Sequence, residues 1–131
     1  MAETWSCKLP DFDLISPNRL YRMHFAQRGR YKRQLESMLF AYGDKIEEIE
    51  SPVEVKITRY YGYRKRQMDE DNLYGACKAL IDAIRVRNKG KSGGLGIIKD
   101  DSPKHMKLDV QQKKSPEKES FVEITVKHLP S

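Results

Sequence analysis

The segment 71–84, DNLYGACKALIDAI, decides the fold, because its apolar residues recur at the spacing of a single helix face. At about 100° per residue, one stripe of this helix is apolar and the opposite stripe is polar. The apolar stripe contains Leu73, Cys77, Leu80, Ile81 and Ile84. The polar stripe contains Asp71, Gly75, Lys78 and Asp82. The sequence therefore predicts an amphipathic helix that starts near Asp71 and presents carboxylates and a lysine on its open side.

Alternating and helical patterns extend outward from this segment. We expect strands at 4–9, from Val53 towards Tyr61, at 97–99 (a strand or merely an extended segment), at 106–110 and at 121–127. A second helix is expected at 28–42, with Gly43 as its stop. The order β-α-β-α-β-β-β predicts one α/β (α+β) domain over residues 1–131, with two main helices packed on a mixed sheet. Residues 85–99 are expected to form a flexible, glycine-rich basic loop.

The charge balance favours a polyanionic partner. Among 131 residues, 34% are charged, and 25 basic against 19 acidic side chains give a net charge of +6. No acidic residue occurs between Asp13 and Glu36, where six cations lie, and a run of cations and tyrosines covers 59–66. Ordinary surface charge and core tyrosines are the competing interpretation. The DNA-binding candidates are Arg19, Arg22, Arg28, Arg30, Arg59, Tyr63, Arg64, Lys65 and Arg66.

Several other classes of protein are disfavoured. Cys7 and Cys77 fall within apolar patterns and are expected to be buried, reduced and structural. No stretch is apolar enough for a signal peptide or a membrane span, so a cytoplasmic protein is expected. The motif at 90–92, Gly-Lys-Ser, lacks the preceding glycine and the strand-then-helix context of a phosphate-binding loop, so no nucleotide cofactor is expected.

Two acidic patches are the candidate metal site. Asp69 and Asp71 lie at the start of the helix 71–84, and Asp100 and Asp101 follow the apolar pair at 97–98. If the sheet brings the two patches together, the carboxylates would hold Mg²⁺ or Mn²⁺, and Lys78 would neutralise a reacting phosphate. The alternative is a helix N-cap with dipole-favouring acids at the first patch and a solvated turn at the second.

These segments resemble the RusA family of Holliday-junction resolvases, which are found in bacteria and lambdoid prophages. The resemblance extends nearly end to end. It is carried by 16–21 (SPNRLY), 64–73 (RKRQMDEDNL), 78–84 (KALIDAI) and 99–102 (KDDS), followed by two final strands.

The resemblance implies a homodimeric endodeoxyribonuclease that nicks four-way DNA junctions in recombination and repair, by metal-assisted hydrolysis of the phosphodiester. It implies metal ligation by Asp69, Asp71 and Asp101, an auxiliary Asp100 and a catalytic Lys78, with Asn72 anchoring the turn. Two features depart from the family pattern. The family's usual lysine position is Gly75 here, and the loop 85–99 is longer than usual. The alternative functions are a RusA-like module that binds branched DNA without cutting it, and a basic interaction domain with no role in nucleic-acid binding.

Overall fold

The computed structural model describes residues 3–85 and 94–130. Within these residues it contains four strands and three helices. In chain order they are β1 (Thr4–Leu9), α1 (Pro17–Arg22), α2 (Phe25–Tyr42), β2 (Val53–Tyr61), α3 (Glu70–Ile84), β3 (Met106–Lys114) and β4 (Phe121–His128). None of these helices has the length and apolar character needed to cross a bilayer.

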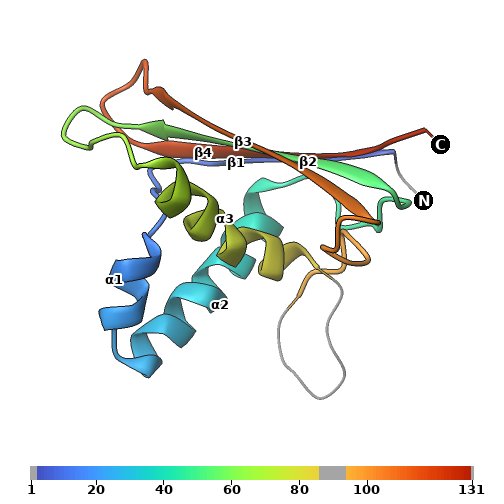
Figure 1. The fold of residues 1–131 in the computed structure, drawn as a ribbon, viewed down its shortest axis with the longest axis horizontal. Coiled ribbons are helices and arrows are strands. Elements are labelled where there is room, and N and C mark those ends of the chain that lie inside the picture. Colours follow the sequence, from blue (N-terminus) through green and yellow to red (C-terminus); the bar gives the residue numbers. More distant parts are fainter. Residues whose placement is uncertain (1–2, 86–93, 131) are drawn as a thin grey trace.

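The four strands form one mixed sheet in the order β1-β4-β2-β3. Strand β4 is antiparallel to both of its neighbours, whereas β3 runs parallel to β2. The three helices lie on the same face of the sheet (Figure 1). This arrangement confirms the expected α+β class, with one mixed sheet and helices packed on it.

The core lies between the sheet and the helices. The period-two alternation in β1 turns Trp5, Cys7 and Leu9 inward, and the same alternation buries Ile124 and Val126 of β4. The predicted apolar stripe of α3 is buried against this layer: Leu73, Cys77, Leu80, Ile81 and Ile84 are all buried. Both cysteines are free and buried, as expected, and burial raises the pKa of the Cys77 thiol to about 12.

Three sequence expectations change in detail. The second helix begins at Phe25 rather than residue 28, because His24 forms a capping box with Gln27 at its start. The cation-rich stretch between Asp13 and Glu36, where only the helix 28–42 is expected, also contains the short helix α1, which Ser16 caps. The strand expected at 106–110 is longer, because β3 continues to Lys114.

The connection from β2 through α3 to β3 determines where the acidic patches lie. Because β2 and β3 are parallel, with Val53 opposite Met106 and Tyr61 opposite Lys114, the helix between them runs back along the sheet. The start of α3 therefore lies at the end of β2, and the segment that enters β3 lies at the other end. Figure 1 shows these two regions at opposite ends of α3.

Residues 94–98 are anchored to the end of α3. The backbone N–H groups of Leu95 and Ile97 donate to carbonyl groups of the last turn at 2.8 and 2.7 Å, and Ile98 forms an isolated bridge with Arg85. This part of the expected flexible loop is therefore held by hydrogen bonds. Of the two possibilities for 97–99, a strand or an extended segment, the structure has the extended segment. The motif at 90–92, which was rejected as a phosphate-binding loop, lies outside the described residues. So do Arg87 and Lys89, two cations of the expected basic loop 85–99.

Candidate metal and DNA-binding site

Asp69 and Asp71 are both exposed at the start of α3. Asp69 is the N-cap, and its carboxylate accepts hydrogen bonds from the backbone N–H of Asn72 at 2.8 Å and from the Asn72 side-chain amide at 3.2 Å. Asp71 lies in the first turn, where the positive end of the helix dipole favours an anion. The N-cap interpretation of Asp69 is confirmed. It leaves lone pairs on both oxygens free for a second partner.

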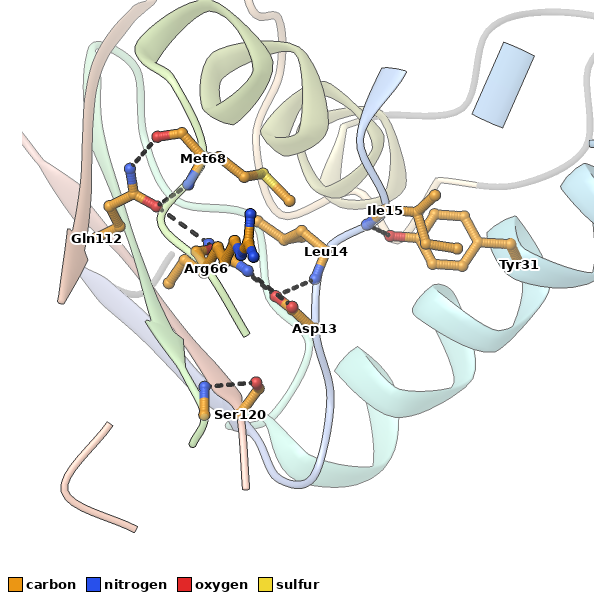
Figure 2. Close-up of polar contacts among 10 residues, drawn as sticks. Asp13, Leu14, Ile15, Tyr31, Arg66, Met68, Gln112 and Ser120 are labelled. Carbon is orange, nitrogen blue, oxygen red and sulfur yellow. Dashed lines mark hydrogen bonds and ion pairs between the residues drawn. The ribbon is translucent and has the colours of Figure 1, made fainter. Parts of the chain in front are cut away.

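A buried polar network fixes the segment that precedes these aspartates. Arg59 of β2 is 2% exposed and pairs with Asp13 through N–O distances of 2.7 and 2.9 Å. Its Nη1 also donates to the Arg66 carbonyl and to the Gln112 side-chain oxygen, at 3.0 and 3.1 Å. The amide of Gln112 on β3 both accepts from the backbone N–H of Met68 and donates to its carbonyl, like a partner strand (Figure 2). Residues 66–68 are therefore tied to the sheet immediately before α3.

The network corrects one sequence prediction. Arg59 is among the residues expected to contact DNA, but its guanidinium is buried and fully engaged with Asp13, Arg66 and Gln112. Burying a guanidinium without a counter-charge is costly, and Asp13 supplies that charge. Arg59 is therefore a structural residue that positions the loop, and it does not reach a ligand.

The other predicted residues of this segment are exposed. Tyr63 is 78% exposed, and Arg64, Lys65 and Arg66 are also open to solvent. The turn that carries them is attached to the connection between β3 and β4, because the Tyr63 N–H donates to the Lys118 carbonyl at 3.0 Å. A hollow of about 530 Å³ lies between the turn and this connection. Its lining includes Tyr63, Arg64, Lys65, Lys118, Asp11 and Asp13.

Helix α1 brings two more predicted cations to the same end of α3. A Cβ built on Gly75 would overlap the Pro17 ring, so the two helices touch at this point. Arg19 and Arg22 are exposed on α1, and Arg28 and Arg30 are exposed on the first turns of α2. The same contact concerns Gly75, the position at which the RusA resemblance implies a lysine. The ring of Pro17 fills the space that a lysine side chain would need there.

The second acidic patch lies at the far end of α3. Asp101 pairs with Arg85, the C-cap residue, at an N–O distance of 3.2 Å. The backbone N–H of Asp101 donates to Asp100 at 2.8 Å, and this hydrogen bond lowers the pKa of the Asp100 carboxyl. These contacts match the turn alternative for the second patch.

The expected convergence of the two patches is therefore not found within one chain. Helix α3 has 15 residues and is about 22 Å long, with Asp71 in its first turn and the partner of Asp101 just after its last. Two ligands of one hard cation lie within about 5 Å of each other. Asp71 and Asp101 of the same chain do not share an ion.

Lys78 lies on the open side of α3, as predicted. It is exposed two helical turns after Asp71, about 10 Å further along the axis, and Asp82 is exposed one turn beyond. Neither side chain forms an ion pair with another residue in 3–85 or 94–130. Lys78 is therefore free to reach a phosphate that lies along the helix.

The residues at the start of α3 suit an open Mg²⁺ site, in which water or substrate supplies some of the ligands, better than a site in which protein side chains supply all of them. In the described part of the chain, no three side chains of His, Cys, Asp or Glu gather as a metal-binding group. Mg²⁺ commonly uses only one or two carboxylates and keeps several waters or substrate phosphates. Asp69 and Asp71 are two such carboxylates, and the cations around them suit the phosphates.

Sequence reasoning missed Asp13 and Gln112, although a signal for Gln112 was present. Met106, Leu108 and Val110 alternate on one face of β3, and Gln112 is the next residue on that face. Arg59 follows Val53, Val55 and Ile57 in the same way. A polar residue at the end of each inward series indicates a buried partner rather than a surface contact.

Comparison of the chain with protein-family models and with curated proteins gave no match.

Proposed function

We propose that this protein is a Mg²⁺-dependent endonuclease of the RusA type that binds and nicks branched DNA. The observation that carries the proposal is the exposed pair Asp69 and Asp71 at the start of α3. It directly follows the exposed cations Arg64 to Arg66 and lies at the end of α3 that touches α1. An acidic pair within a basic surface suits a metal ion that binds together with a phosphodiester.

Each part of this surface has a distinct task. The cations at 64–66 and on α1 hold the DNA backbone, and the guanidinium groups among them grip phosphate oxygens in bidentate fashion. Asp69 and Asp71 would hold Mg²⁺, which when bound polarises the scissile phosphate and lowers the pKa of a coordinated water. Lys78 stabilises negative charge on phosphate oxygens further along α3. The buried Arg59–Gln112 network holds 66–68 so that these groups keep their spacing.

The proposed functional unit is a homodimer, as the RusA resemblance implies, because a four-way junction offers two equivalent strands. The proposed ligand set is smaller than the one that the resemblance implies. Within one chain, the metal would have Asp69 and Asp71 as its carboxylates, while Asp101 is already neutralised by Arg85. In a dimer, Asp101 contributes only if it comes from the second chain.

The second candidate function is binding of branched DNA without cutting. Two observations favour it: Gly75 lies against Pro17 where the family's lysine would be, and Asp101 is held away from Asp71. This function uses the same basic surface and needs no metal.

Nicking of a synthetic four-way junction separates the two. We expect the purified protein to nick the junction in Mg²⁺ or Mn²⁺ and not in EDTA. Asp71→Asn should reduce the rate at least about 100-fold while leaving the junction affinity within about threefold. Asp82→Asn, an exposed aspartate further along the same side of α3, is the matched control and should nick at the wild-type rate.

The possible results have clear meanings. Binding without metal-dependent nicking by the wild-type protein would establish the second function. Equal nicking by the wild type and Asp71→Asn would refute the assignment of the metal site. An affinity for the junction that does not fall with added salt would exclude both DNA-binding functions, because release of counterions requires such a fall.

A further inference from the structure

The corner between α1 and α2 exposes two large aromatic rings. Tyr21 on α1 is 85% exposed, and Phe25, the first residue of α2, is 71% exposed. The backbone turns between the helices at Met23, which is extended, and His24. Figure 1 shows this corner projecting from the helical layer, away from the sheet. Rings this open to water bury little apolar area within the fold, which leaves their faces available to a partner.

Several contacts anchor the corner to the rest of the fold. Leu20 packs partly buried against the core, and Pro17 fits against Gly75, so the remaining side chains of α1 face outward. The Tyr31 hydroxyl accepts a hydrogen bond from the Ile15 N–H at 3.3 Å just before α1 (Figure 2). The chain that leads into α1 is thereby tied to the buried side of α2.

His24 fixes the ring of Phe25. Its Nδ1 accepts from the Ala26 N–H at 3.2 Å, and its own backbone N–H donates to the Gln27 side chain at 3.3 Å. The rings of His24 and Phe25 lie 4.5 Å apart between centroids, tilted by 34°. The ring of Phe25 is therefore backed on one side by imidazole and open on the other, as a stacking surface must be.

The charge around the two rings selects the kind of partner. Six exposed cations surround them in sequence, and no acidic residue occurs from 14 to 35. These cations are Arg19, Arg22, Arg28, Arg30, Lys32 and Arg33. None of them forms an ion pair within the part of the chain that the structure describes. A second copy of this corner would bring like charges together, whereas a polyanion with flat rings complements both features.

We propose that this aromatic-basic corner binds unpaired nucleotides, with Tyr21 and Phe25 stacking on bases and the neighbouring arginines holding phosphates. Continuous duplex DNA offers phosphates but no free base faces, because its bases are already stacked. The corner therefore distinguishes DNA that contains unpaired bases from uniform duplex. The inference deepens the proposed function, on which it rests for its DNA substrate, by assigning the recognition of opened bases at a branch point to this corner.

The test compares two pairs of exposed aromatic residues. The double variant Tyr21→Ala with Phe25→Ala removes the proposed stacking rings. The matched control, Phe40→Ala with Tyr42→Ala, removes rings that are 68% and 56% exposed at the other end of α2. Binding is measured by fluorescence anisotropy across a salt series. The probes are a labelled single strand of thymidines, a fully paired duplex and a four-way junction.

We expect selective effects on affinity. The Tyr21 and Phe25 variant should bind the single strand about tenfold or more weakly per ring removed, with duplex affinity nearly unchanged and the same salt slope. Arg22→Ala with Arg28→Ala should weaken binding of both probes and lower the salt slope by about one for each phosphate that is no longer neutralised. The conservative variant Phe25→Tyr retains a stacking ring and should keep the wild-type affinity for the single strand.

Several outcomes would overturn the inference. Equal weakening by the two aromatic pairs would do so, as would equal weakening on single strand and duplex. A change in sedimentation mass with unaltered DNA affinity would show instead that the corner pairs two copies of the chain. If Phe25→Tyr weakens binding as much as the alanine pair, stacking is not the interaction.

Failure of this inference is distinguishable from failure of the proposed function. If the wild-type protein nicks junctions while the Tyr21 and Phe25 alanine variant binds every probe normally, the proposed role of the corner is refuted and the proposed nuclease function stands. A wild-type protein that never nicks, but whose alanine pair binds the single strand weakly, would refute the nuclease and leave the corner.

Discussion

At the start of α3, Asp69 and Asp71 are open to solvent, whereas beyond its end Asp101 lies 3.2 Å from the Arg85 guanidinium. The cations near the start belong to neighbouring segments and point to solvent, so the acidic pair is not neutralised by an ion pair within the described residues. At the far end, the cation belongs to the helix itself and already satisfies the acid. The two aspartate clusters therefore differ in their ability to accept a metal ion, because Asp101 is already paired with Arg85 whereas Asp69 and Asp71 are not paired with a cation of the described residues.

The two ends also differ in how they are held. The segment before α3 is fastened by a buried network around Arg59, whose side chain is 2% exposed. The pair at the other end leaves Arg85 and Asp101 26% and 27% exposed. Buried polar networks fix geometry strictly, while partly exposed pairs contribute little to stability. This contrast can be tested by removing one partner at each end.

The largest expected effect comes from Arg59→Met. The change leaves the Asp13 carboxylate, whose side chain is only 14% exposed, without its counter-charge, and we expect the free energy of unfolding to fall by about 3–5 kcal/mol. Arg85→Met is the matched change at the other end and should cost at most about 1 kcal/mol. Urea denaturation followed by circular dichroism measures both values. Equal decreases would mean that the two ends are held alike.

A second effect concerns metal affinity. Asp71→Asn should weaken Mn²⁺ binding about 100-fold or more, because it removes one of two carboxylates, whereas Asp101→Asn should leave the affinity unchanged in a monomeric preparation. Electron paramagnetic resonance of free Mn²⁺ gives the two dissociation constants. If Asp101→Asn weakens binding by the monomer as much as Asp71→Asn does, the two carboxylates share an ion within one chain and the assigned separation is wrong. The same result in a dimer alone would mean that a second chain supplies Asp101 to the site.

A third effect lies where α1 meets α3. Gly75→Ala places a methyl group against the Pro17 ring, and we expect a decrease of about 1–3 kcal/mol in the free energy of unfolding. Combining it with Pro17→Ala removes the obstructing ring, so the double variant should be destabilised by less than the sum of the single effects. Strictly additive effects would show that the two residues do not touch.

The smallest effect at neutral pH concerns the buried side of α3. Burial raises the pKa of the Cys77 thiol to about 12, so the folded state holds this proton more tightly than the unfolded chain. Stability is therefore unaffected well below about pH 8.5, the pH at which an exposed thiol is half ionised, and falls as pH rises from there towards 12. Urea midpoints between about pH 8 and 10.5 measure this slope, which should be shallower in Cys77→Ala. An identical slope in that variant would assign the alkaline decrease to other groups.

Apolar periodicity predicted the elements well where it was strong. The stripe of α3 and the alternation of β1 and β4 are as expected, because burial on one face leaves a regular spacing. The start of α2 lies earlier than the pattern predicts, because His24 is an uncommon cap and the first turns of the helix bury nothing. Local sequence patterns thus predict which helices and strands form better than they predict the residues at which those helices and strands begin and end.

The candidate site was only partly predictable. The exposure of Asp69, Asp71 and Lys78 followed from the helical pattern. The separation of Asp101 depends on β3 being parallel to β2, since a parallel crossover places the start of the helix and the entry to the next strand at opposite ends of the sheet. Local patterns do not encode strand direction. The prediction that Arg59 contacts DNA was wrong. It rested on the run of cations at 59–66, whereas Arg59 continues the series of inward-facing residues of β2.

The only tryptophan of the chain lies where the helical layer meets the sheet. The Trp5 indole N–H donates to the Asp44 carbonyl at 3.0 Å, and a Cβ on Gly43, the C-cap of α2, would lie 2.6 Å from the indole ring. The tryptophan emission therefore responds to the docking of the α2 terminus on β1 as well as to the burial of Trp5 in the sheet. Fluorescence excited selectively at the indole can follow the assembly of this junction without any introduced label.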